Sequence, residues 1–268
     1  MNVQAKRGRG TQLIERIPFE TDAGIAARAR LGLLVLATDY TLEHEFRTVL
    51  ARLPGVALYE SRLWNDTTIT PETLAAMEGR IAPAAALLLP GDRFDVVAFG
   101  CTSASMILGE ARVFELIAEA KPEAKATTPI TAAFAAFRAF GARRIGVLTP
   151  YPAEVNATVQ RYVEAAGFEI PVFGSFNEGH DPTVAAISPA SLRSAARRVA
   201  EAAPVDAVFV ACTSLRLLEA AESIEVELGL PVTSSNHAMI WHCLRLAGID
   251  DAIPGFGRLY RLPADGAA

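Results

Sequence analysis

The chain has 268 residues, of which 51% are hydrophobic and 21% charged, and its formal net charge is −5. These values are typical of one large or two small globular domains and exclude a disordered chain. The acidic balance argues against nucleic-acid binding, and no apolar run approaches the roughly 20 residues of a membrane span. Three cysteines are too few for a disulfide framework and favour the reducing cytoplasm: Cys101, Cys212 and Cys243.

Residues 1–29 are expected to form an N-terminal arm, because they contain basic residues but no apolar signal segment. Beyond them, short Val-, Leu- and Ile-rich runs alternate with longer stretches of helical spacing, which predicts parallel sheets covered by helices. Strands are expected at Leu31–Ala37, Val56–Glu60, Val96–Phe99, Ile145–Leu148, Glu169–Phe173, Ala207–Ala211 and Pro231–Thr233. Helices are expected at Glu43–Leu53, Pro71–Leu88, Ile107–Ala120, Ala132–Phe140, Ala153–Ala166, Pro189–Ala203, Leu215–Leu228 and Ala238–Ala247.

The sequence also contains an internal repeat. The segment FDVVAFGCTS, at residues 94–103, reappears as VDAVFVACTS at residues 205–214. Arg30–Leu34 likewise reappears as Arg144–Leu148. Such a long interval indicates duplicated domains and not a solenoid. We therefore expect an α/β protein of two Rossmann-like (flavodoxin-like) halves, residues 30–142 and 143–268, related by a pseudo-twofold axis. The C-terminal helix can cross to the first half, and the active site is expected in the cleft between the halves.

Each copy of the repeat places a cysteine just after a buried strand, followed by Thr-Ser and a helix. Ligands of open parallel sheets bind beyond the carboxyl ends of the strands. The N–H groups of a turn and helix start suit a carboxylate there, and they lower the pKa of a thiol. Two opposed cysteines, Cys101 and Cys212, can then serve as base and acid in proton transfer, or one thiolate can add to an activated carbon. Neither route needs a metal or an organic cofactor.

Other polar residues have simpler interpretations. Cys243 lies mid-helix and is expected in the core. The spacing of His237, His242 and Cys243 does not place two ligands on one helix face, so no metal site is expected. The polar loop from Asn177 to Asp181 either closes over the substrate or is an ordinary surface loop.

At the two Cys-Thr motifs the sequence resembles the aspartate/glutamate racemase superfamily. Within it the chain is similar above all to the ectoine-utilization (EutA) proteins, and also to maleate cis–trans isomerases and arylmalonate decarboxylases. The resemblance begins near Arg30 and is carried by FGCTSASMILGE, TPITAAFAAFRAFGA, VLTPY and PVTSSNHAMIWHCLRLAG. It implies a cofactor-independent cytoplasmic enzyme, a small carboxylate substrate, a homo-oligomer (dimer or tetramer), and catalysis by Cys101 and Cys212.

The resemblance also implies substrate-binding residues. Thr102 and Ser103 match hydroxyls that hold a carboxylate, and Tyr151 matches a tyrosine that donates to the same group. Thr38-Asp39 stands where maleate isomerases have Ser-Asn, so an acid replaces an amide and allows a substrate with a cationic or N–H group. The second motif adds Thr213 and Ser214 to the expected site.

The resulting prediction is an isomerase or racemase of a small carboxylate in ectoine utilization. One alternative is a maleate cis–trans isomerase. Another is an arylmalonate-decarboxylase-like enzyme, although that family has glycine where this chain has Cys101. In a different class, a two-lobed binding or sensor protein fits the fold, but it does not need thiols on both walls of the cleft.

Overall fold

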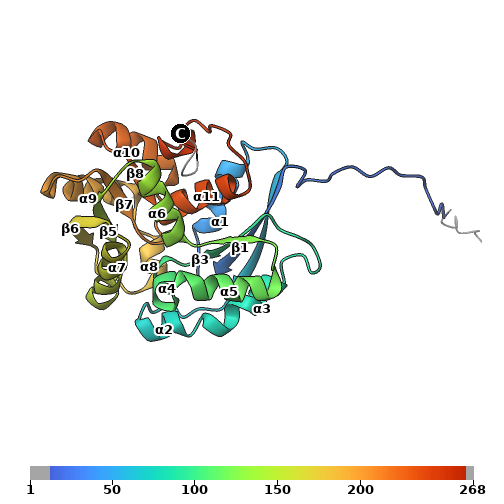
Figure 1. The fold of residues 1–268 in the computed structure, drawn as a ribbon, viewed down its shortest axis with the longest axis horizontal. Coiled ribbons are helices and arrows are strands. Elements are labelled where there is room, and N and C mark those ends of the chain that lie inside the picture. Colours follow the sequence, from blue (N-terminus) through green and yellow to red (C-terminus); the bar gives the residue numbers. More distant parts are fainter. Residues whose placement is uncertain (1–12, 264–268) are drawn as a thin grey trace, which may run out of the picture.

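The computed structural model describes residues 13–263 and shows two four-stranded parallel sheets (Figure 1). The strand order is β2-β1-β3-β4 in the first sheet and β6-β5-β7-β8 in the second, so the second half repeats the topology of the first. This confirms the predicted α/β fold with two related halves. The strands are β1 (Ala29–Leu36), β2 (Val56–Leu63), β3 (Val96–Gly100), β4 (Lys125–Thr127), β5 (Arg144–Thr149), β6 (Glu169–Ser175), β7 (Ala207–Val210) and β8 (Val232–Ser234).

Helices cover both sheets, and proline-led starts mark several of them. Thr70 and Ser188 accept hydrogen bonds from backbone N–H groups at the starts of α2 and α9, as their sequences predict. The helices are α1 (Leu42–Leu50), α2 (Pro71–Ala75), α3 (Glu78–Ala86), α4 (Thr102–Leu108), α5 (Glu110–Ala120), α6 (Pro129–Ala139), α7 (Ala153–Ala165), α8 (Asp181–Ala185), α9 (Pro189–Ala202), α10 (Ala221–Leu228) and α11 (Ser235–Leu246), with 3-10 turns η1 (Leu218–Ala220) and η2 (Leu259–Arg261).

Two expected helices are each divided in the structure. The helix expected over Pro71–Leu88 is interrupted between α2 and α3. The helix expected from Ile107 begins earlier, at Thr102, and breaks at Gly109, whose φ is +83°. This left-handed region favours glycine, so the break between α4 and α5 falls where the chain can turn without strain.

The last helix of each half packs against the other half. Phe137 of α6 makes edge-to-face contacts with Phe168 and Phe209, with ring centroids 5.1 and 5.3 Å apart. Helix α11 packs in a second core with the first sheet, where Trp241 and Leu33 are both buried. This exchange joins the halves through their hydrophobic cores.

The repeated glycines of β1 and β5 allow the covering side chains to approach the sheets closely. A Cβ built on Gly32 would lie 2.8 Å from the Leu88 side chain, and one on Gly146 would lie 2.7 Å from Val199. Both distances are shorter than real Cβ contacts, so no larger residue fits without a shift.

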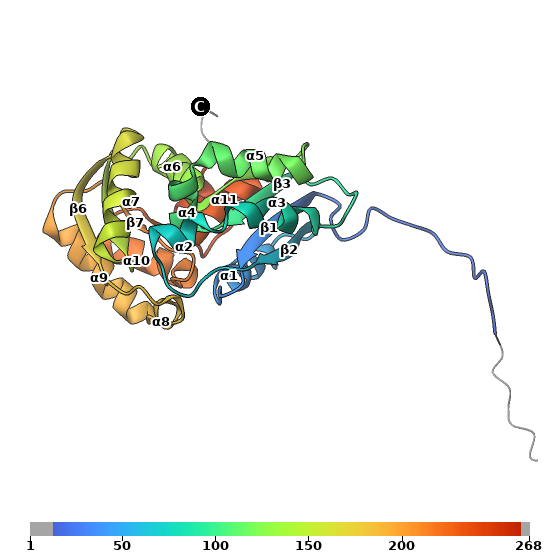
Figure 2. The ribbon, with the colours of Figure 1, turned by 90° about the horizontal axis from the view of Figure 1, so that it is seen from below.

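Residues 13–28 form no helix or strand and extend away from the body of the molecule (Figures 1 and 2). Leu13, Ile14, Ile17 and Phe19 are exposed along this segment. Residues 1–12 of the expected arm lie outside the described residues. Within residues 13–263, no helix combines the length and apolar character that crossing a membrane requires.

Candidate active site

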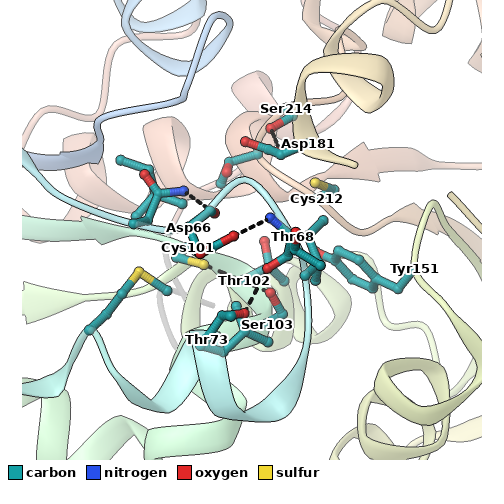
Figure 3. A pocket seen from close by; sticks show the side chains of 16 residues that line it. Asp66, Thr68, Thr73, Cys101, Thr102, Ser103, Tyr151, Asp181, Cys212 and Ser214 are labelled. Atoms are coloured by element: carbon teal, nitrogen blue, oxygen red, sulfur yellow. Dashed lines mark hydrogen bonds between the residues drawn. The ribbon is translucent and has the colours of Figure 1, made fainter. Parts of the chain in front are cut away.

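The structure brings Cys101 and Cys212 to one pocket between the two halves (Figure 3). Cys101 directly follows β3 at the start of α4, and Cys212 follows β7 after a single residue. Both are buried, with 4% and 5% exposure. The cavity volume of the pocket is about 30 Å³, and about 420 Å³ is free of protein atoms when the space open to solvent is included. It is lined by Leu36, Asn65, Asp66, Thr68, Ile69, Thr73, Leu74, Met77, Cys101, Thr102, Ser103, Tyr151, Asp181, Cys212, Thr213 and Ser214.

Hydroxyl groups surround the two sulfurs. The Ser103 Oγ atom lies 3.8 Å from the Cys101 sulfur. The Tyr151 side chain is buried beside Cys212, and its hydroxyl stabilises the Cys212 thiolate by hydrogen bonding. Ser103 and Tyr151 therefore stand, together with the start of α4, where a substrate carboxylate can accept hydrogen bonds.

The threonines of the two motifs link the halves to each other. The Thr102 hydroxyl donates to Ser235 Oγ of α11 at 2.7 Å, and the same Oγ accepts the Cys212 backbone N–H at 3.1 Å. The Thr213 hydroxyl points to the Gly100 carbonyl oxygen at 3.4 Å. Both threonines line the pocket, but their hydroxyl protons are directed toward protein acceptors.

Thr38 and Asp39 do not line the pocket. One oxygen of Asp39 accepts the backbone N–H groups of Thr41 and Leu42, both at 2.7 Å, and so caps the start of α1. Burial raises the pKa of Asp39 to about 6, and repulsion by Asp181 adds to this effect. The structure therefore places Asp39 behind the pocket wall, in a capping position.

Asp181 is a pocket residue that the sequence did not single out as a ligand. It is 5% exposed and accepts hydrogen bonds from Thr38 and Ser214, each at 2.7 Å. Its one sequence signal is its position at the end of the polar loop that begins at Asn177, just before Pro182.

Two loops from matching positions of the halves meet beside the pocket. Thr68, after β2, forms an antiparallel bridge with His180, after β6. The Ile69 N–H donates to the Gly179 carbonyl oxygen, and the Asp181 N–H donates to that of Thr67, both at 3.0 Å. Of the loop from Asn177 to Asp181, Asp181 lines the pocket, and the loop is held there by its counterpart in the first half.

Burial determines the protonation state of both thiols. It raises the pKa of Cys101 to about 11, although the Ala104 N–H and the Ser103 hydroxyl oppose it. Burial also raises the pKa of Cys212, and the negative charge of Asp181 raises it further. A hydrogen bond with Tyr151 acts in the opposite direction and lowers this pKa. The expectation that the helix start lowers these pKa values is therefore wrong, because the loss of water outweighs a few N–H groups.

The remaining candidates have structural roles. Cys243 is buried in the α11 core. His237 is fully buried, with its ring nitrogens 3.0 Å from Thr233 Oγ1 and 2.6 Å from the Phe256 carbonyl oxygen. In the part of the chain that the structure describes, no group of three or more His, Cys, Asp or Glu side chains is arranged to hold a metal ion.

Comparison with known sequences identifies a family. The family model for arylmalonate decarboxylase matches residues 59–260. A maleate isomerase from Nocardia farcinica is 30% identical over 87% of this chain and 95% of its own length. An arylmalonate decarboxylase from Bordetella bronchiseptica is 34% identical over 50% of this chain and 57% of its own length.

Solved structures show the same similarity. The maleate isomerase Iso from Pseudomonas putida S16 has a TM-score of 0.78 at 25% identity, covering 87% of this chain and 98% of that one. A mutant maleate cis–trans isomerase from Nocardia farcinica also has a TM-score of 0.78, at 29% identity and with the same coverage. That mutant contains a covalently bound succinylcysteine intermediate.

Proposed function

We propose that this chain, which belongs to the arylmalonate decarboxylase family, is a cofactor-independent cis–trans isomerase of a small unsaturated carboxylate. The observation that carries this proposal is the convergence of Cys101 and Cys212, from matching strand ends, on one small pocket. The relatives described above are maleate isomerases and an arylmalonate decarboxylase. They support the maleate-isomerase alternative better than a role in ectoine utilization.

The two cysteines suit thiol addition followed by elimination. A thiolate adds to one alkene carbon, forming an S–C bond, and the π electron pair moves to the neighbouring carbon. The opposite thiol donates its proton to that carbon, which leaves a single bond about which the substrate rotates. The opposite thiolate then takes the proton back, the S–C bond breaks, and the double bond re-forms in the trans geometry. Both cysteines end in their starting protonation states. The succinylcysteine in the Nocardia farcinica mutant is an intermediate of this kind.

The surroundings of the thiols favour Cys101 as the nucleophile. Its pKa is raised less than that of Cys212, and Ser103 and the Ala104 N–H both stabilise its thiolate. Cys212 stays protonated to higher pH and is therefore the thiol that holds a proton to donate. Ser103 and Tyr151 lie where they can hold the substrate carboxylate during rotation.

The proposal is tested by following cis–trans conversion with proton NMR. The purified full-length chain is incubated with maleate, and also with maleamate, the monoamide of maleate. We expect the trans product to form, and Cys101→Ser and Cys212→Ser to lower kcat by about 10³-fold or more. The matched control is Cys243→Ala, which removes a buried thiol outside the pocket and should retain activity. Equal activity of all three variants would contradict the proposal.

A further inference from the structure

The charged groups that line the pocket are acidic. Of the described residues that line it, Asp66 and Asp181 carry carboxylates, and none is Lys, Arg or His. A third carboxylate, Asp39, is buried behind the wall, and one of its oxygens has no hydrogen-bond partner among the described residues. Arg62, which is not a lining residue, donates to the Asp39 carbonyl oxygen. A substrate with two carboxylates would bring one of them close to Asp66 or Asp181, and no lining residue is a cation that balances that charge.

The hydrogen-bonding groups differ between the two ends of the pocket. At one end, Thr38 and Ser214 already direct their hydroxyl protons to Asp181. Each oxygen of the Asp181 carboxylate can accept a further hydrogen bond, so this end presents acceptors. At the other end, the Ser103 and Tyr151 hydroxyls can donate. In Figure 3, Asp181 and Ser214 lie on one side of the two cysteines, and Ser103 lies on the other side.

We propose, on the basis of the isomerase function above, that the substrate carries a single carboxylate and a hydrogen-bond donor in place of the second one. The carboxylate binds at Ser103 and Tyr151, and an N–H group of an amide or ammonium donates to Asp181. Asp181 is then the residue that determines specificity, since it accepts an N–H group and repels a carboxylate.

A donor at Asp181 also assists the chemistry. The charge of Asp181 raises the pKa values of Cys101 and Cys212. An N–H group that donates to the Asp181 carboxylate offsets part of its negative charge. The repulsion between Asp181 and a thiolate is then smaller, which lowers the pKa of the thiol. For an amide substrate, the thiolate adds to the alkene carbon next to the carboxylate. The electron pair moves to the other alkene carbon, where the neighbouring amide carbonyl stabilises the negative charge.

The test compares kcat/KM for maleate and maleamate by proton NMR. For the unmodified protein we expect maleamate to be preferred by at least about tenfold. Asp181→Asn should lower this preference at least about tenfold and improve the use of maleate. A preference for maleate, or a preference that Asp181→Asn leaves unchanged, would overturn the inference while leaving the isomerase function intact. Conversion of neither compound would contradict the isomerase function itself, and this inference with it.

The Asp181→Asn variant is expected to fold. The amide has the shape of the carboxylate, and the Thr38 and Ser214 hydroxyls can each accept as well as donate, so both contacts can persist. Thermal unfolding checks this expectation. The control is Glu201→Gln, because Glu201 is an exposed carboxylate of α9 that does not line the pocket and whose charge is screened by water. Its substitution should change the preference by less than about threefold, and a change as large as that of Asp181→Asn would contradict the assignment to Asp181.

Discussion

Cys101 and Cys212 occupy equivalent positions in the repeat, but their neighbours differ. Cys101 has the Ser103 hydroxyl and the Ala104 N–H close to its sulfur. Cys212 has the Tyr151 hydroxyl and the Ser214 N–H, and the charge of Asp181 weighs more heavily on its pKa. This difference in charge is the basis of the proposed roles, with Cys101 as the nucleophile and Cys212 as the proton donor.

The raised pKa of Cys101 predicts a particular pH dependence. Because that pKa is about 11, only a small fraction of Cys101 is thiolate at neutral pH, and this fraction grows about tenfold for each pH unit. We therefore expect kcat/KM to rise steeply from pH 7 to pH 9, since Cys212 stays protonated over this range. Initial rates at constant ionic strength measure the profile, with circular dichroism as a check on folding. A flat or falling profile would contradict the assignment.

At this scale, the repeat in the sequence was sufficient to predict the cysteine pair. It could not predict Asp181, because the residue becomes a pocket wall only where two loops from different halves meet. Asp39 was predicted as a substrate contact from its position after the first strand. In the structure one of its oxygens accepts the Thr41 and Leu42 N–H groups at the start of α1.

Helix α11 connects the two cysteine motifs. Its first residue, Ser235, is fully buried, and its hydroxyl oxygen accepts hydrogen bonds from the Cys212 N–H and the Thr102 hydroxyl. The start of a helix that crosses from the second half to the first therefore contacts both cysteine motifs. We expect this contact to set the relative positions of the two sulfurs.

Replacement of Ser235 by alanine tests this coupling. The variant leaves the buried Cys212 N–H without its acceptor, so we expect a loss of about 1–3 kcal/mol in the free energy of unfolding. A lower kcat should accompany it, because the Cys212 turn is less firmly held. Urea titration and NMR assays measure the two effects. The matched control is Ser188→Ala, which removes the α9 cap and should cost about 1 kcal/mol without changing kcat. Ser235→Ala with unaltered kcat would contradict this role.

Strands were predicted more closely than helices. The seven expected strands overlap β1, β2, β3, β5, β6, β7 and β8, with ends that differ by at most three residues, since continuous Val, Leu and Ile runs are buried on both faces of a parallel sheet. Strand β4 was not predicted, because its three residues, Lys-Ala-Thr, contain no apolar run. The helix predicted over Pro71–Leu88 is two helices in the structure, and the helix predicted from Ile107 begins earlier, at Thr102. Both errors arise because the helical spacing of apolar residues continues across the point where one helix ends and the next begins. At Gly109 the glycine itself was the missed signal.

The whole molecule is built by duplication. The two sheets share one strand order, and equivalent strand ends and loops from both halves surround a single pocket. The repeat predicted this arrangement, because matching segments in the same order require matching folds. The homo-oligomer expected from the family resemblance stays a prediction.

Intact-protein mass spectrometry of Cys212→Ser tests the central claim most directly. Incubated with maleate or maleamate, this variant keeps the Cys101 nucleophile. Water supplies the proton to the neighbouring carbon, and no opposing thiolate is present to remove it again. We therefore expect an added mass of one substrate molecule, located on Cys101 by peptide mapping. The Cys101→Ser variant under the same conditions should gain no mass. An adduct on neither variant, or on Cys101→Ser alone, would contradict thiol addition by Cys101.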